Sequence, residues 1–173
     1  MPEYSFILVI EGDVEEKIDD LFEAGCDDAT FGSVDGAYYA DFDRDAPTLG
    51  GALSSAIDAV ESVPGLRIRR VEPDDLVTMT EIAQRLGRTR ESVRLLIAGE
   101  RGPGNFPPPV SHLRQRNRLW RWSDVAAWVG ESDADDLAKA RLIAAVNAAL
   151  ELRTATPGLA ESDRALGLKL LHA

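Results

Sequence analysis

Short runs in which apolar and polar residues alternate predict strands over residues 1–73, and two runs with helical spacing separate them. Four strands are expected, at residues 4–10, 29–34, 37–42 and 66–71. Two helices are expected, at residues 14–24 and 47–62. The first helix has four apolar side chains at helical spacing that are expected to face a core: Val14, Ile18, Leu21 and Phe22. Residues 1–73 are therefore expected to form one domain of mixed helices and strands.

The order strand, helix, strand, strand, helix, strand is that of a ferredoxin-like fold. The first expected strand is apolar on both faces, because Phe6, Leu8 and Ile10 alternate with Ile7 and Val9. Two helices cover only one face of such a sheet. We therefore expect the second face to be covered either by the rest of the chain or by a twin subunit.

Residues 75–129 follow a short joint and show the pattern of two short helices connected by a glycine. Thr78 and Glu81 have the spacing of a capping box at the start of the first helix, which Gly87 ends. Thr89 is placed to cap a second helix over residues 90–98. The side chains expected to face inward are Ile82, Ala83, Leu86, Val93, Leu96 and Ile97. Two such helices that cross at a small residue make a helix-turn-helix.

A proline-bearing link and a basic hairpin follow the second helix. The hairpin is expected at residues 112–122, with its tip at residues 115–117. Trp120 and Trp122 alternate with Arg121, so both tryptophans are expected to point inward. A basic hairpin that follows a helix-turn-helix is in the position of a wing, which lies along the phosphate backbone of DNA or in its minor groove.

Helical spacing returns in the last part of the chain. Ser123 is expected to cap a closing helix whose apolar side chains are Val125, Trp128 and Val129. A polar joint at residues 131–136 then leads to a tail over residues 134–173. The tail is expected to hold one helix at 137–152, a break at Pro157-Gly158, and a short last helix at 161–171. The predicted fold class is thus α+β, with a ferredoxin-like domain at 1–73, a winged helix-turn-helix at 75–129 and a helical tail at 134–173.

Charge is distributed unevenly along the chain, whose formal net charge is -11. Residues 1–76 carry 19 acidic and 5 basic side chains, a net charge of −14. Residues 77–129 carry 4 acidic side chains and 9 arginines, a net charge of +5, and residues 130–173 have a net charge of −2. A basic segment inside an acidic chain indicates a module that binds nucleic acid.

The outer face of the second helix is the candidate base-reading surface, because arginine binds guanine through two hydrogen bonds and also neutralises phosphates. The candidate residues there are Arg88, Thr89, Arg90, Glu91 and Arg94. Glu91 either accepts a hydrogen bond from a cytosine amino group or pairs with a neighbouring arginine. The candidate backbone contacts in the hairpin are Arg114, Arg116 and Arg118.

The ordered set of motifs resembles a known family. The stretch "LVTMTEIAQRLGRTRESVRLLIAGERGPGNFPPPV", with "RLWRWSDVAAWV" after it, is similar to the winged helix-turn-helix domain of the MerR/excisionase-like superfamily over about residues 75–129. The resemblance implies that residues 88–94 hold the recognition positions and that residues 114–118 form the wing. The link between them is longer and richer in Gly and Pro than the compact family form, and the long heptad helix by which MerR regulators dimerise is missing.

Enzymatic and metal-dependent functions find little support. The acidic stretches at residues 13–16, 27–28 and 41–45 could hold Mg²⁺, but no phosphate-binding loop, nucleophile elbow or Ser/His/Asp set accompanies them. Cys26 is the only cysteine and is expected to be a small buried apolar residue. We expect no enzyme activity, no cofactor, no bound metal and no membrane contact, in a cytoplasmic protein.

These observations predict a sequence-specific protein that binds double-stranded DNA and regulates transcription. Because one helix and one wing contact few base pairs, a homodimer on a two-fold site is expected. Two alternatives remain: an excisionase-like or architectural DNA-binding factor of a mobile element, and an antitoxin-like protein that binds both DNA and a protein partner. The acidic residues 1–73 would serve dimerisation and solubility, capture of a protein partner, or autoinhibition of the basic segment.

Overall fold

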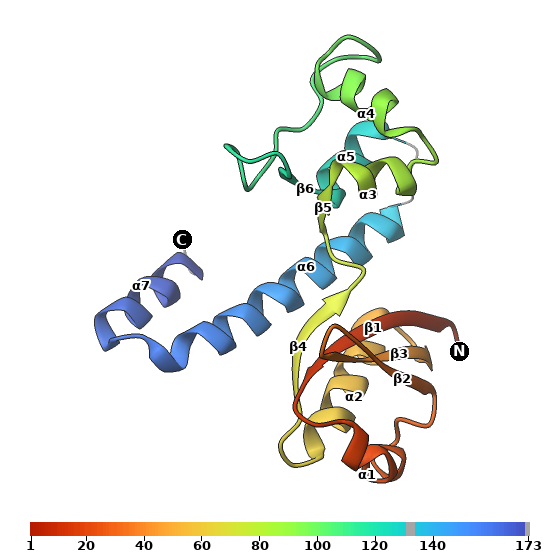
Figure 1. The fold of residues 1–173 in the computed structure, drawn as a ribbon, viewed down its shortest axis with the longest axis vertical. Helices are drawn as coiled ribbons and strands as arrows, with labels where there is room; N and C mark the ends of the chain where they lie inside the picture. The colour runs from red at the N-terminus through yellow and green to blue at the C-terminus, as the bar shows by residue number, and fades with distance from the viewer. Residues whose placement is uncertain (131–133, 172–173) are drawn as a thin grey trace. The chain divides into compact units, whose positions relative to one another are not determined.

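The computed structural model describes residues 1–130 and 134–171, and it shows a mixed α+β protein (Figure 1). The contacts within the chain define two compact units. We call Met1–Pro73 together with the described part of Ala145–Ala173 the N-terminal unit, and the described part of Asp74–Ala144 the central unit. The break after Pro73 lies where the sequence predicted a boundary. The tail was expected as a separate part, whereas its residues from 145 onward pack with residues 1–73.

The N-terminal unit contains a four-stranded antiparallel sheet. Its strands are β1 (Glu3–Glu11), β2 (Ala29–Val34), β3 (Ala37–Asp45) and β4 (Arg67–Glu72), in the spatial order β2-β3-β1-β4. Its first helical elements are a 3-10 turn η1 (Glu15–Lys17), α1 (Ile18–Glu23) and α2 (Leu49–Ser62). The expected order of strands and helices is therefore present, and each expected strand forms within three residues of its expected ends.

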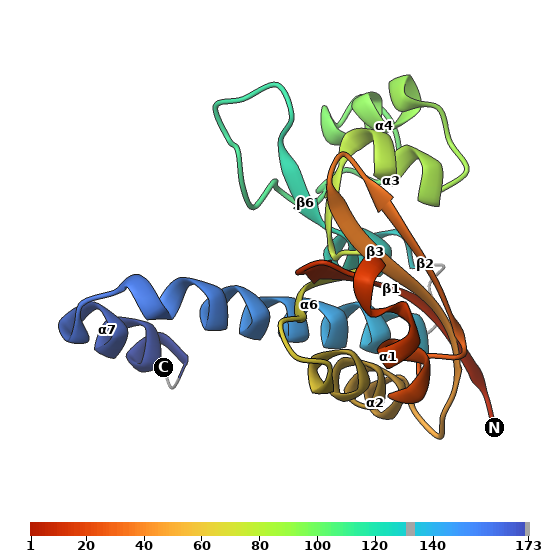
Figure 2. The same cartoon turned by 60° about the horizontal axis from the view of Figure 1, so that its bottom comes forward.

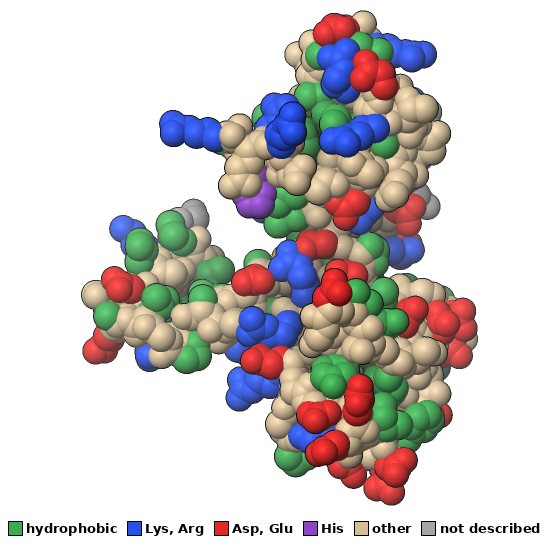
Figure 3. All heavy atoms as spheres, viewed as in Figure 1, with side chains coloured by type: hydrophobic (Ala, Val, Ile, Leu, Met, Phe, Trp, Pro, Cys, Tyr) green, Lys and Arg blue, Asp and Glu red, His purple; other side chains and the backbone are tan. Residues whose placement is uncertain are grey.

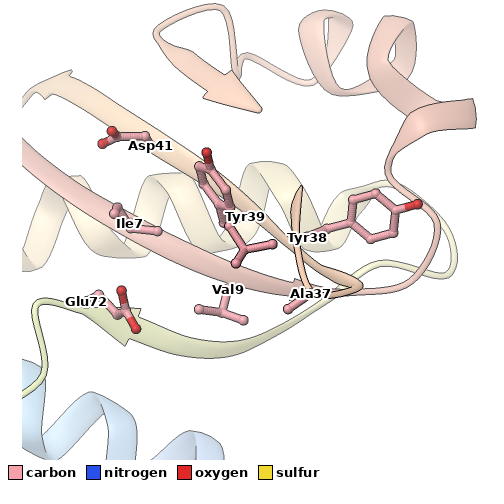
Figure 4. Close-up of a pocket in the computed structure, with 8 residues that line it drawn as sticks. Ile7, Val9, Ala37, Tyr38, Tyr39, Asp41 and Glu72 are labelled. Carbon is pink, nitrogen blue, oxygen red and sulfur yellow. The ribbon is translucent and has the colours of Figure 1, made fainter. Parts of the chain in front are cut away.

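One face of this sheet carries the core of the unit. Phe6, Leu8 and Ile10 are buried there, and the Phe6 ring stacks on Phe42 of β3 with 5.4 Å between the centroids. α2 packs against this face, behind the strands in Figure 4. Thr48 begins α2 by accepting a hydrogen bond from the Gly51 amide at 3.1 Å. Burial of this apolar face provides the main stabilisation of the unit.

The helix expected at residues 14–24 is interrupted. Lys17 leaves the helical region at φ -123 and ψ 15, and its ammonium donates a hydrogen bond to the Pro64 carbonyl. The chain therefore forms a 3-10 turn and a six-residue helix instead of one long helix. In this arrangement Leu21 is buried, but Phe22, which we expected to face the core, is 50% exposed.

Side chains from α6 (Ala134–Ala155) and one from α2 close the outer edge of β4. The Asn147 amide donates to the Val71 carbonyl at 2.9 Å and accepts from the Val71 amide at 2.8 Å. Arg153 donates to the Ile68 carbonyl at 2.8 Å, and Glu61 accepts from the Ile68 amide at 2.8 Å. These side chains satisfy backbone groups that an edge strand would otherwise leave unpaired.

The central unit is built around a two-stranded antiparallel sheet of β5 (Leu76–Thr78) and β6 (Leu119–Arg121). Its helices are α3 (Met79–Arg85), α4 (Arg90–Ile97) and α5 (Trp122–Val129). The buried residues of its core are Val77, Ile82, Ala83, Val93, Trp120 and Val125. Trp122 packs against this core, so both tryptophans of the expected hairpin point inward as predicted.

The start of α5 differs from the prediction, because Asp75 and not Ser123 caps it. The Asp75 carboxylate is buried and accepts hydrogen bonds from the Ser123 amide at 2.7 Å and from the Ser123 hydroxyl at 3.2 Å. It also pairs with Arg121 at 3.3 Å. Asp75, which directly precedes β5, thus ties the start of β5 to α5.

Residues 134–171 are largely helical, as predicted. α6 extends the helix expected at 137–152 in both directions, and after a 3-10 turn η2 (Thr156–Gly158) α7 (Glu161–Leu171) coincides with the expected last helix. Part of the expected joint at 131–136 and the end of the expected tail, residues 172–173, lie outside the described residues. Within the part of the chain that the structure describes, no helix is both long and apolar enough to span a membrane.

Candidate nucleic-acid interface

Local sequence fixes where α4 begins. Thr78 and Glu81 form the predicted capping box, in which Thr78 accepts from the Glu81 amide at 3.3 Å and Glu81 accepts from the Thr78 amide at 2.6 Å. Gly87 then adopts φ 60, which an L side chain rarely takes. Thr89 caps α4 by accepting from the Ser92 amide at 3.1 Å. The turn between the two helices is therefore set by three local signals.

α4 has a buried face and an exposed face. Val93 is fully buried and Leu96 is 2% exposed. The exposed residues at its start and along its outer side are Arg88, Thr89, Arg90, Glu91 and Arg94. All five predicted recognition residues are thus brought together on the solvent side of one helix and its entrance.

The arginines of this surface differ in their partners. The Arg94 Nε donates to both Glu91 carboxylate oxygens, at 3.0 and 3.1 Å, and Arg94 lies 3.7 Å from Glu100. The pKa of Arg94 is raised above its ordinary value, mainly because Arg94 donates this hydrogen bond to Glu91. Among residues 1–130 and 134–171 no ion pair is found for Arg88 or Arg90. Glu91 therefore pairs with a neighbouring arginine in the free protein.

Positive charge at the start of α4 works against helix stability. The first turn of a helix carries partial positive charge, so a cation there costs about 0.3–1 kcal/mol at an exposed site. Arg90 is the first residue of α4, and Arg88 precedes its cap. Since neither has a carboxylate partner among the described residues, these two arginines and the helix start together offer unneutralised positive charge to an anion.

The segment expected as a wing forms a loop over residues 112–118 and not a regular hairpin. One bridge between Ser111 and Leu119 closes it, and the Gln115 amide donates to the His112 carbonyl at 2.9 Å. β6 pairs along its length with β5, because Leu119–Arg121 complete the core sheet with Leu76–Thr78, and it meets the other arm of the loop at Leu119. The loop keeps its arginines exposed: Arg114, Arg116 and Arg118.

Only one of the three loop arginines lies over a ring. The Arg118 guanidinium carbon is 5.8 Å from the centroid of the Trp120 ring, at a distance typical of a cation–π contact. Arg114 and Arg116 have no ion pair within the described ranges 1–130 and 134–171. Figure 3 shows basic side chains over the surface of α4 and of the loop before β6. The predicted backbone-contact residues are therefore open to solvent.

The long link between α4 and the loop is anchored by an aromatic contact that the sequence analysis did not identify. Phe106 meets Trp128 of α5 edge to face, with 5.0 Å between ring centroids. The Trp128 indole donates to the Gly104 carbonyl at 2.9 Å. The signal in the sequence was Phe106, an aromatic residue inside a stretch rich in Gly and Pro, which indicates a buried anchor point. The contact fixes the middle of the link to α5.

The second face of the N-terminal sheet is open within its own unit. A groove of about 500 Å³ lies on it, lined by Ile7, Val9, Val34, Ala37, Tyr38, Tyr39, Asp41 and Glu72 (Figure 4). In the strand register, Ile7 lies between Asp41 of β3 and Glu72 of β4. The lining of the groove comes from the four strands alone, and no described residue of the tail from 145 onward takes part. The face combines an apolar centre with acidic neighbours.

The acidic stretches do not assemble into a metal centre in the part of the chain that the structure describes. Asp28 instead accepts two hydrogen bonds at 2.7 Å from Arg44, whose guanidinium also donates to the Gly25 carbonyl at 2.6 Å. Cys26 is buried as predicted, and this burial raises the pKa of its thiol to about 11 despite the opposing effect of the Arg44 charge.

A comparison with protein-family models, with curated proteins and with solved structures found no match for this chain.

Proposed function

We propose that this chain is a sequence-specific double-stranded DNA-binding protein that regulates transcription. In this proposal the central unit is a winged helix-turn-helix of the MerR/excisionase-like kind, with α4 in the major groove and the loop at residues 112–118 on the backbone. The N-terminal unit would be a ferredoxin-like domain, and the protein would be cytoplasmic and without enzyme activity. Two copies would bind a two-fold site.

The unpaired arginines at the start of α4 are the observation that carries the proposal. Arg88 and Arg90 are exposed, and neither has an ion pair among the described residues. They stand where cations cost helix stability, while Val93 and Leu96 hold the opposite face of the helix in the core. These arginines lack anionic partners. Duplex DNA supplies them as phosphates, and its major groove adds hydrogen-bond donors and acceptors that arginine can bind.

A selection from random duplex DNA by the full chain at physiological salt tests this function. The proposal predicts an enriched motif with two-fold symmetry. Enrichment without a motif, together with bending of the bound DNA, would assign the alternative role of an excisionase-like or architectural factor. Absence of duplex binding at low salt would overturn the proposal, since phosphate contacts are strongest there.

A second candidate function is favoured by the groove on the N-terminal sheet. Its apolar centre beside Asp41 and Glu72 suits a basic, partly apolar protein partner, as an antitoxin-like role requires. Co-purification from the native host with the full chain and with Ile7→Lys compares the two surfaces. This role would be supported if a partner co-purifies with the wild type and with Arg90→Ala but not with Ile7→Lys. Loss with Arg90→Ala instead would place the partner on the central unit.

A further inference from the structure

The two edges of the N-terminal sheet differ in what lies beside them. At one edge, side chains of α2 and α6 bind the backbone of β4. The other edge is β2, the outermost strand on that side (Figures 1 and 2). Its sequence, ATFGSV, contains no charged residue and no proline, and its register with β3 runs without a bulge. Charges, prolines and bulges commonly prevent an edge strand from pairing, so β2 remains able to pair.

The backbone groups that β2 directs outward belong to every second residue. Just before β2 begins, the Asp43 amide donates to the Asp28 carbonyl at 3.1 Å. Because hydrogen-bonded pairs alternate along an antiparallel ladder, Phe31 and Ser33 direct their amides and carbonyls away from β3. Among residues 1–130 and 134–171, these groups have no hydrogen-bond partner. Donors and acceptors at alternate positions along an edge are what a further strand binds.

A hollow beside this edge suits apolar side chains of such a strand. It has a volume of about 250 Å³, and its lining includes Val14, Ile18 and Phe31. Phe31 lies on the face that the helices cover, because it is paired with the buried Ala40 of β3. An added strand would place every second side chain on this face. Apolar side chains there would enter the hollow and be removed from water.

The opposite face of the edge carries an aromatic ring and a carboxylate. A Cβ added to Gly32 would lie 2.5 Å from the hydroxyl oxygen of Tyr39, so the Tyr39 side chain lies across β2. Figure 4 shows the Tyr38 and Tyr39 rings turned in different directions. Asp41 is exposed on the same face of β3 as Tyr39. A basic side chain on this face of an added strand would meet the ring and be attracted by the carboxylate.

The charge around this edge favours a basic partner over a second copy of the chain. Residues 11–45 contain thirteen acidic side chains and two basic ones. Both basic residues, Lys17 and Arg44, already have partners within the unit, whereas the exposed Glu15 lines the hollow. Two copies joined at β2 would bring two sets of carboxylates together, and this repulsion opposes self-pairing. A basic strand is attracted by the same charges.

We propose that the outer edge of β2 binds an extended basic segment of another protein, which joins the sheet as a fifth strand. Apolar side chains of this segment alternate with lysine or arginine. The apolar ones enter the hollow, and the basic ones lie over Tyr39 toward Asp41. Backbone hydrogen bonds to Phe31 and Ser33 hold the segment in place. The site belongs to the N-terminal unit alone and does not depend on the proposed binding of DNA.

A peptide of defined sequence tests this site on the full chain. The probe alternates valine and lysine and is blocked at both ends, and its control has proline in place of valine. The control has the same charge but lacks every second backbone donor. Isothermal titration calorimetry at physiological salt should show that the wild type binds the probe at least about tenfold more tightly than the control.

Amide hydrogen exchange followed by nuclear magnetic resonance distinguishes strand addition from binding by charge alone. When the probe is bound, exchange of the Phe31 and Ser33 amides should slow, because these amides gain acceptors. The Thr30 and Gly32 amides point toward β3 and should change little. Tight binding without this alternating protection would overturn strand addition.

Two pairs of variants test the position of the site. Ser33→Pro removes an outward donor and Ser33→Ala keeps it, so the first should weaken probe binding by roughly tenfold or more and the second should not. Glu15→Lys should weaken it by roughly fivefold, and Glu16→Lys, the same change outside the hollow, by less. Far-UV circular dichroism shows whether each variant is folded, and the pair at residues 15 and 16 decides if Ser33→Pro is not.

The site is overturned if the wild type binds neither peptide, binds both alike, or binds the probe equally well after Ser33→Pro and Glu15→Lys. Sedimentation equilibrium tests the other occupant. A wild-type dimer that Ser33→Pro converts to a monomer would assign the edge to a second copy and overturn the basic partner. If the chain binds the probe selectively but selects no DNA, the site stands and the proposed function fails.

Discussion

Asp75 connects two elements that are far apart in the sequence. Its carboxylate is buried and accepts from the Ser123 amide, the Ser123 hydroxyl and Arg121. Because removal of an acceptor leaves buried donors without partners, Asp75→Ala should lower the free energy of unfolding of the central unit by about 3 kcal/mol. Urea unfolding followed by tryptophan fluorescence measures this, since Trp120, Trp122 and Trp128 all lie in this unit. Exposed Asp124→Asn is the control, and the loss of its charge from the first turn of α5 should cost no more than about 1 kcal/mol.

Cys26 is expected to be chemically inert in the folded protein. Its thiol is buried and has a pKa raised to about 11, so little thiolate is present at pH 8. Alkylation by iodoacetamide at pH 8 should be slower than in denaturant by on the order of a hundredfold or more. Mass spectrometry over time gives both rates. Equal rates in the two conditions would mean that the thiol is accessible in the native state.

At the scale of elements, the attachment of α6 to β4 should depend on pH. Burial alone would raise the pKa of Glu61, but hydrogen bonds from Arg153 and the Ile68 amide, with the Arg153 charge, lower that pKa overall. A lowered folded pKa contributes stability above the unfolded value of about 4.3, and this contribution is lost as the pH falls through the folded value. The protection factors of the β4 amides, which are exchange rates corrected for the intrinsic effect of pH, should therefore fall on acidification below about pH 4.5 in the wild type.

Glu61→Gln is the matched variant for this test. It should exchange faster than the wild type at pH 7, because the charged partner of Arg153 is missing. The difference in exchange rate between the two proteins should shrink toward pH 3, because Glu61 of the wild type is then protonated and, like Gln, uncharged. A difference between the two proteins that stays constant from pH 7 to pH 3 would contradict the role of the Glu61 charge.

The pair of Glu91 and Arg94 on the outer face of α4 allows a test of how the helix reads DNA. In the free protein Glu91 holds Arg94 through two hydrogen bonds. If Glu91 only restrains Arg94, Glu91→Gln removes a negative charge and frees the guanidinium, so affinity for all duplexes should rise several-fold. If Glu91 accepts from a cytosine, affinity for the selected site should fall while affinity for random duplex rises. Fluorescence anisotropy with both duplexes separates these results, and we expect the first.

Elements specified by neighbouring residues could be predicted from the sequence, and those specified by distant ones could not. The capping box of Thr78 and Glu81, the turn at Gly87 and the cap at Thr89 formed as expected, because each needs only residues a few positions apart. The role of Asp75 depends on Ser123, and the closure of β4 depends on Asn147, so neither could be predicted from local pattern.

The candidate site follows the same division. Helical periodicity alone placed Arg90 and Arg94 on the solvent side of α4, with Arg88 at its entrance. Periodicity could not show that Arg94 is held by Glu91 and Glu100 while Arg90 is not, since partner choice depends on side-chain geometry. The segment at residues 112–122 was expected as a hairpin, but its second arm, Leu119–Arg121, pairs with β5, a strand more than 40 residues earlier. Leu119 also exchanges backbone hydrogen bonds with Ser111 at the start of the loop.

For the whole molecule, the separation of charge along the chain indicates which part of it would contact DNA. Residues 1–76 have a net charge of −14 and residues 77–129 a net charge of +5. An acidic segment repels phosphate and a basic one attracts it, so the chain should meet a duplex through its central unit alone. A two-fold site would require a second copy of α4.

The most direct test of base reading by α4 is the ratio of affinities for the selected duplex and a scrambled duplex, measured by fluorescence anisotropy at physiological salt. Arg90→Ala should lower affinity for the selected duplex by roughly tenfold or more and lower the ratio. Arg116→Ala should weaken both duplexes alike, and Arg67→Ala, an exposed residue of the N-terminal unit, should change neither. An equal loss on both duplexes with Arg90→Ala would contradict base reading by α4.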